Sequence, residues 1–187
     1  MRFEKNIFYG GSHHKLLSRS SFNGLFTQPG GGFVLNTDKQ IKSIEFFMTL
    51  TTKDPTTLIN ALNTNFSWTS QVVNKQNISK VYINGIDKTS HTSINTLLPY
   101  VNDLYHVIIV FNSPISEEIL FNSGTLDPAI LYKNLAIYEY ELDSNKVQEH
   151  YNLYTSIPAA SFGSNTITVT ESAIKAFDVN WQVIQSR

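Results

Sequence analysis

The sequence contains no cysteine. Disulfide bonds and thiolate metal sites are therefore excluded, and a small secreted domain held together by disulfides is not expected. Charged residues make up 16% of the 187 residues, below the ~25% usual for a soluble domain, and the net charge is −1. No two Lys or Arg residues are adjacent. Because nucleic-acid-binding proteins carry a basic patch or stripe, we expect no nucleic-acid partner.

Long apolar runs are also lacking. No stretch approaches the ~20 apolar residues that cross a bilayer, so we expect no membrane insertion. The first residues, MRFEKNIFYGG, place a glutamate and a lysine where a signal peptide needs an apolar run. The sequence therefore predicts no export signal.

What is present is a strand-forming composition. Hydrophobic residues reach 41% and aromatic residues 12%, enough for a core, and Ser, Thr and Asn supply the polar positions. Alternating or β-branched runs predict strands at 33–36, 41–52, 57–62, 65–73, 94–98, 103–111, 117–122, 135–142, 166–170 and 176–184. Residues 108–111 are apolar without alternation, as in a central strand covered on both faces.

Two local signals complete the expected fold. Asn84-Gly85, within 80–87, is the dipeptide that a type I′ hairpin turn requires. Asp143 is a good helix N-cap, followed by Val147, Tyr151 and Tyr154 at i, i+4 and i+7 on one helical face.

We therefore predict an all-β fold, a two-sheet antiparallel β-sandwich (jelly roll) with one short helix near the C-terminus. Residues 1–21 are expected to form an N-terminal arm or edge strand, and residues 22–187 a single sandwich domain.

Three segments carry a resemblance to a known family. They are YKNLAIYEYELDSNKVQEHYNLY (132–154), KVYINGID (80–87) and DLYHVIIVF (103–111). Together they resemble the laminin-G-like domains of the concanavalin A-like lectin/glucanase superfamily, of the kind found in phage virion and tail proteins. In that family the corresponding patterns are L-S-x-x-E-[IV]-x-x-x-Y, lYvNG and W-H-H-V-A-V. Tyr105 stands here in place of the tryptophan, and Lys146 in place of the glutamate.

Sugar binding is the first kind of site that the resemblance implies. Carbohydrate sites use an aromatic ring as a stacking platform, and Trp68, Tyr82 and Tyr105 are the candidates by position on strands that the family often uses. Packing of the same rings in the core is the alternative reading of each.

Catalytic and metal signals are weaker. The E-x-D-x-x-E motif of laminarinase-type enzymes is absent, and Glu139 and Glu141, at i and i+2, are expected to be structural or solvated. We therefore predict that the chain is not an enzyme.

No cofactor is expected to be required. His13 and His14 are adjacent, so in a strand they would point to opposite faces and are not expected to share a metal. Ca²⁺ is the favoured metal if one is bound, through turn residues such as Asp54, Asp87, Asn102 and Asp103, which are also explained by turn chemistry alone.

The expected function is a non-catalytic carbohydrate-recognition or adhesion module on a bacteriophage virion or tail, with the bacterial cell surface as an alternative location. The alternative function is a virion structural or assembly protein that contacts only other subunits, and a glycan-degrading enzyme is the third hypothesis. The expected partners are accordingly a cell-surface glycan, other virion subunits, or further copies of the same chain.

Overall fold

The computed structural model describes residues 2–3, 16–19, 25–27, 31–36, 39–124 and 127–156. The strands are β1 (Arg2–Phe3), β2 (Leu16–Arg19), β3 (Leu25–Phe26), β4 (Phe33–Leu35), β5 (Ile41–Leu50), β6 (Thr56–Ala61), β7 (Thr64–Thr69), β8 (Val72–Gln76), β9 (Ile78–Ile83), β10 (Ile86–Asp87), β11 (Leu104–Ile115), β12 (Ile119–Phe121) and β13 (Ile130–Tyr138). The helices are α1 (Ile94–Leu97) and α2 (Ser144–Ser156).

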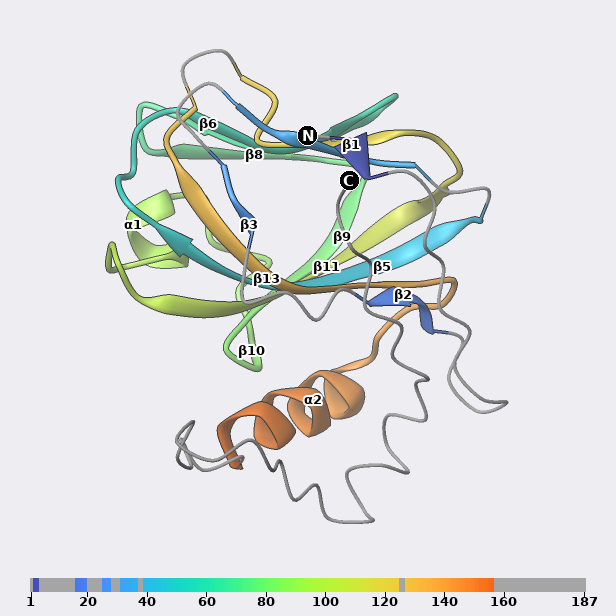
Figure 1. The fold of residues 1–187 in the computed structure, drawn as a ribbon. Coiled ribbons are helices and arrows are strands. Elements are labelled where there is room, and N and C mark those ends of the chain that lie inside the picture. Colours follow the sequence, from blue (N-terminus) through green and yellow to red (C-terminus); the bar gives the residue numbers. More distant parts are fainter. Residues whose placement is uncertain are drawn as a thin grey trace, which may run out of the picture.

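The strands form two stacked sheets (Figure 1). The first sheet has the order β1-β4-β12-β6-β7-β8, and the second has the order β10-β9-β11-β5-β13-β2, with β3 also paired to β13. The pairings are antiparallel except that of β1 with β4, which is parallel. The predicted all-β sandwich with a short helix following the last described strand is thus confirmed. β1 and β2 lie at sheet edges, while the predicted domain boundary at residue 22 stays a prediction.

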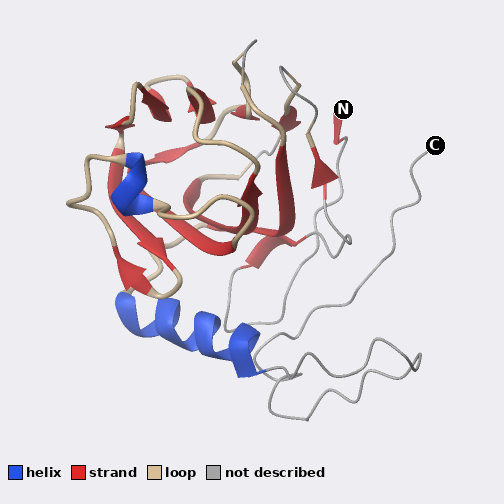
Figure 2. Cartoon of the chain, turned by 90° about the vertical axis from the view of Figure 1, so that its left-hand side faces the viewer, coloured by secondary structure: helices blue, strands red, loops and turns tan. Residues whose placement is uncertain are grey.

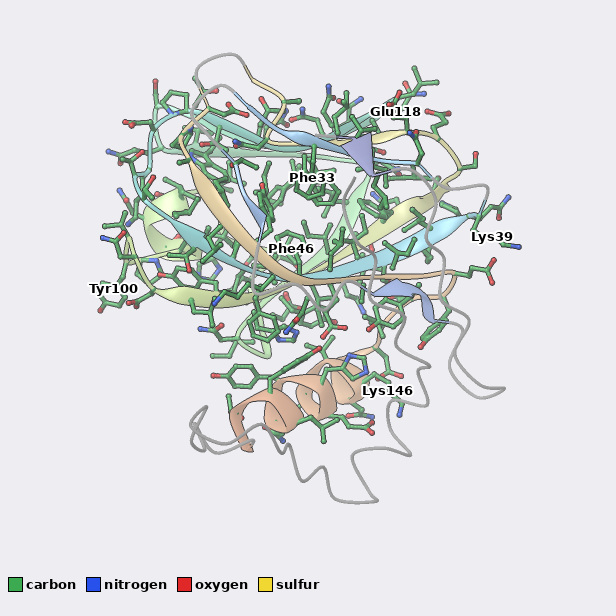
Figure 3. The ribbon with its side chains drawn as sticks, viewed as in Figure 1. Phe33, Lys39, Phe46, Tyr100, Glu118 and Lys146 are labelled. Atoms are coloured by element: carbon green, nitrogen blue, oxygen red, sulfur yellow. The ribbon has the colours of Figure 1, made fainter. Side chains whose placement is uncertain are left out.

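The main core lies between the two sheets. Phe33 and Phe46 extend into this space from opposite sheets (Figure 3). The ring of Phe33 stacks on that of Phe121 with centroids 4.6 Å apart, and Tyr132 meets both rings edge-on. Such aromatic packing supplies much of the apolar area that stabilises a sandwich.

The second sheet is covered on both of its faces. Ile109 and Phe111 of β11 point into the main core, whereas Ile108 and Val110 point to the outer face and pack beneath α2. Figure 2 shows α2 lying below the strands, on that side of the molecule. The prediction that 108–111 forms a central strand buried on both faces is confirmed.

The start of α2 follows from the predicted cap. Asp143 Oδ1 accepts hydrogen bonds from the backbone N–H groups of Asn145 and Lys146, both at 2.9 Å. These bonds satisfy two of the amides that a helix N-terminus leaves without partners. Val147 then lies on the buried side of the helix.

The Asn-Gly hairpin also forms as predicted. Asn84 and Gly85 have φ of 53° and 78°, and Ile83 pairs with Ile86 across them. A Cβ at Gly85 would lie 3.0 Å from a ring carbon of Tyr151, so α2 packs closely against this turn.

Three predicted strands differ from the structure. Residues 65–73 contain a turn at Ser70 and Gln71, whose φ values of 48° and 71° separate β7 from β8. Residues 94–98 contain the helix α1, because the Ser93 hydroxyl caps it by accepting from Asn95 N. The strand predicted at 135–142 is β13, which begins earlier and ends at Tyr138. The predicted strands 166–170 and 176–184 lie outside the described residues.

Candidate functional site

The three residues predicted to stack against sugars lie in the interior. Trp68 and Tyr105 are 1% and 3% exposed in the core between the sheets, and Tyr82 is 3% exposed beneath α2. The indole Nε1 of Trp68 donates to Asp54 O at 2.8 Å, and the Tyr105 hydroxyl bonds both backbone groups of Tyr100. None of these rings offers a free face to a ligand. Their burial favours the core-packing alternative, and a ligand role for them stays a prediction.

A polar pocket of about 280 Å³ lies at the end of the sandwich away from α1. It is lined by Leu62, Asn63, Thr64, Asn77, Ser113, Pro114, Ile115 and Glu117. These residues come from the β6–β7 turn, the β8–β9 corner and the irregular end of β11. Figure 3 labels a residue near each end of the sandwich. Glu118 directly follows the pocket residue Glu117 in the sequence, and Tyr100 lies near α1 at the opposite end.

Asn77 fixes the floor of the pocket. With φ of 59°, it turns the chain from β8 in the first sheet to β9 in the second. Its side-chain amide donates to Thr64 Oγ1 at 2.8 Å and to Ser113 O at 3.1 Å, and its Oδ1 accepts from Ser113 N at 2.9 Å. The floor is therefore held by side-chain and backbone hydrogen bonds before any ligand arrives. The exposed rim consists of Leu62, Asn63 and Glu117, together with residues 113–114.

A second polar arrangement is buried on the outer face of the second sheet. Glu45 of β5 is surrounded by His106 of β11, Tyr138 of β13 and His150 of α2. Its Oε1 lies 2.8 Å from His106 Nε2, and its Oε2 lies 3.0 Å from His150 Nδ1 and also accepts from the Tyr138 hydroxyl. Glu45 and His106 are almost fully buried, and the side chain of His150 is 11% exposed. We call Glu45, His106, Tyr138 and His150 the Glu45 cluster.

The charge state of the cluster follows from two opposing effects. Burial alone raises the pKa of Glu45, but hydrogen bonds from His106 and His150, and the attraction to their charge, hold it well below its usual range. The carboxylate is therefore ionised at neutral pH. Because an ionised carboxylate only accepts hydrogen bonds, both imidazoles must donate to it.

The cluster can hold α2 to the sheet, because it joins three strands and the helix through one carboxylate. It does not form a metal site: within the described ranges, no three or more His, Cys, Asp or Glu side chains are placed to hold a metal ion. Sequence reasoning missed Glu45. The available signal was a single charged residue in the middle of the apolar strand IKSIEFFMTL.

Several residues considered for catalysis and for calcium make turn or surface contacts. Glu141 pairs with Lys80 at 3.3 Å on the surface. Asp54 Oδ2 accepts from the Thr52 hydroxyl at 2.7 Å, and Asp87 Oδ1 accepts from Thr89 N at 2.8 Å, as turn carboxylates do. Asn102 has φ of 64° in the turn before β11, next to Asp103. Calcium binding by these residues stays a prediction.

Comparisons with known proteins were made with family models, curated proteins and solved structures. No family model and no curated protein matches the chain. Among solved structures, the chain aligns with Trypanosoma rangeli sialidase at 11% identity and a TM-score of 0.40, over 80% of this chain and 33% of that one. The chain thus spans about a third of the length of that protein. The β-sandwich stands, whereas the finer assignment to laminin-G-like domains is not confirmed.

One prediction is corrected by this comparison. The matched protein is a sialidase, which is an enzyme, and this contradicts the prediction that the chain is not an enzyme. That prediction is withdrawn. At this identity and TM-score, the match assigns no activity to the chain.

Neither described helix has the length and apolar character needed to cross a bilayer.

Proposed function

We propose that the domain recognises carbohydrate, and that it does so at the pocket between the β6–β7 turn and the end of β11. The observation that carries this proposal is the pocket's construction, a hydrogen-bonded floor beneath a rim of amide, carboxylate and small apolar side chains. Sugars present hydroxyl groups and C–H faces together, and this rim offers a partner for each.

Each part of the rim has a role in this proposal. The side chains of Asn63 and Glu117 are exposed at the rim, where they can pair with sugar hydroxyls. Leu62, which is 69% exposed, and Pro114 offer apolar surface for a C–H face. Because the described residues that line the pocket include no aromatic ring, we expect weak binding at a single site, strengthened where several copies act together. Display on a bacteriophage virion or tail, as the sequence suggests, would supply such copies.

A glycan-array screen of the purified chain tests this proposal, run with Ca²⁺ and again with EDTA. We expect saturable binding to one sugar class. Glu117→Ala and Asn63→Gly, which keeps the positive φ at residue 63, should each weaken it about tenfold, the effect of losing one hydrogen bond that involves a charged or well-placed group.

Glu118→Ala is the matched control, because Glu118 is exposed and adjacent to Glu117 but does not line the pocket. Binding that survives both pocket substitutions would place the site elsewhere. No binding under either metal condition would reject carbohydrate recognition.

A second function, assembly through protein contacts, is favoured by a different observation. Tyr100 and Leu104 are 65% and 51% exposed near α1, with Val101 between them, at the end of the sandwich opposite the pocket. Apolar side chains gathered in this way are typical of contact surfaces. If this end mediates assembly, sedimentation should show self-association that Tyr100→Ser with Leu104→Ser abolishes and that Ile86→Thr, an exposed control on β10, leaves intact. A chain that stays monomeric at high concentration would contradict self-assembly.

A further inference from the structure

Helix α2 is held less tightly than the strands beneath it. Among its described side chains, Val147 alone is fully buried, and the others are half-buried or exposed. Figures 1 and 3 show the helix set apart from the second sheet, with side chains filling the space between them. An element with few buried apolar groups and no sheet hydrogen bonds belongs to the low-stability part of a fold.

Polar and aromatic contacts hold the helix in place. His150 Nδ1 bonds Glu45 Oε2 at 3.0 Å, and the ring of Tyr154 meets that of Phe47 edge-on with centroids 4.5 Å apart. Tyr151 stacks over His106 at 5.9 Å and lies against Gly85. Of these, the His150–Glu45 bond is the one made to a buried charge, so its loss has the largest effect on docking.

The surface beneath α2 is rich in aromatic rings. Tyr82, Phe47 and Tyr138 come from β9, β5 and β13, and all three are buried on this outer face. In the sheet, Tyr82 pairs with Ile108 and Ile108 pairs with Glu45, so Tyr82 lies two strands from the buried carboxylate. Tyr138 donates a hydrogen bond to that carboxylate, and Phe47 follows Glu45 by two residues on the same strand. Removing the helix would break no strand pairing.

We propose that α2 is a releasable cover latched to the second sheet by the His150–Glu45 bond, and that its release exposes an aromatic face formed by Phe47, Tyr82 and Tyr138. This device lies away from the proposed carbohydrate pocket and does not depend on it.

Hydrogen exchange of the full chain, read by mass spectrometry, tests the latch. His150→Ala should raise the exchange rate of the α2 amides about tenfold or more, because it removes a hydrogen bond to a charged group. The amides of β5, β9 and β11 should keep their protection. Asn152→Ala, an exposed position on the same helix, is the matched control for helix propensity and should change little.

Hydroxyl-radical footprinting of the same proteins tests the exposed face. Labelling of Phe47 and Tyr82 should rise in His150→Ala, while Trp68 in the main core should stay protected in both proteins. Unchanged α2 exchange would overturn the latch, and faster exchange with Phe47 and Tyr82 still protected would mean that the helix frays in place. If the amides of every strand lost protection as much as those of α2, the His150–Glu45 bond would stabilise the whole fold rather than the helix alone. That result would also contradict a releasable cover.

Discussion

Replacing Glu45 by Gln should lower the free energy of unfolding by about 3–5 kcal/mol at pH 7, the usual effect of removing one partner of a buried charge pair. A Gln amide would turn one of its N–H groups toward His106, His150 or the Tyr138 hydroxyl, all of which donate to the carboxylate in the native protein. Chemical denaturation followed by circular dichroism measures this loss. Glu141→Gln is the control, because its surface ion pair with Lys80 should contribute at most ~1 kcal/mol.

The same substitution should change the pH dependence of stability. The folded-state pKa of Glu45 lies well below its ordinary value of 4.5, so the stabilisation is present above that pH and is lost as the pH falls further. The groups that face the carboxylate are His106, Tyr138 and His150, and burial, together with the nearby charge of Glu45, raises the pKa of Tyr140. We expect the stabilities of wild type and Glu45→Gln to converge between pH 4.5 and strong acid. Parallel curves over that range would contradict the assigned charge state.

Trp68→Ala should destabilise the domain by about 3–5 kcal/mol, because it opens a cavity in the core between the sheets. It also removes the indole that donates to Asp54 O at 2.8 Å, at the turn between β5 and β6. The same denaturation measurement detects the change. Trp68→Phe should recover a large part of the loss, because it restores most of the apolar volume but not the hydrogen bond.

A Trp68→Ala variant as stable as wild type would mean that the ring is not a core residue.

The expected loss of stability in Trp68→Ala also affects how a sugar-binding assay of that variant is interpreted. Because the alanine variant is destabilised, its failure to bind a sugar would report unfolding rather than a lost contact, so the pocket substitutions are the sharper test.

The elements that sequence reasoning predicted best are those encoded by neighbouring residues. Asn84-Gly85 specifies its turn, and Asp143 caps its helix, because both act within two or three residues. Ser70-Gln71 forms a turn without Gly, Pro or Asn, so it gave no such signal. In 94–98 the buried Ile94, Leu97 and Leu98 follow helical spacing, but one turn is too short to be distinguished from a strand.

The candidate sites could not be predicted in the same way. His106, Tyr138 and His150 are separated from Glu45 by 61, 93 and 105 residues. The sheet order brings His106 and Tyr138 to Glu45, and the packing of α2 on the sheet brings His150. The pocket likewise combines a turn, a corner and a strand end. In β9, alternation places the ring of Tyr82 on the outer face, away from its neighbours Val81 and Ile83 in the core. Alternation does not show whether another element covers that face, and here α2 does.

The turns of this chain limit the freedom of its unfolded state. Among the described residues, eight other than glycine have positive φ, and six of these are asparagine: Asn63, Asn77, Asn84, Asn102, Asn122 and Asn134. Glycine would adopt the same backbone at less steric strain, but it would leave the denatured chain more conformations to lose on folding, an effect of about 0.4–1 kcal/mol per site. Asparagine accepts the left-handed conformation and still carries a Cβ. The use of asparagine at these turns, and at the irregularity of β13 in the case of Asn134, therefore reduces the conformational entropy that the chain must give up to fold.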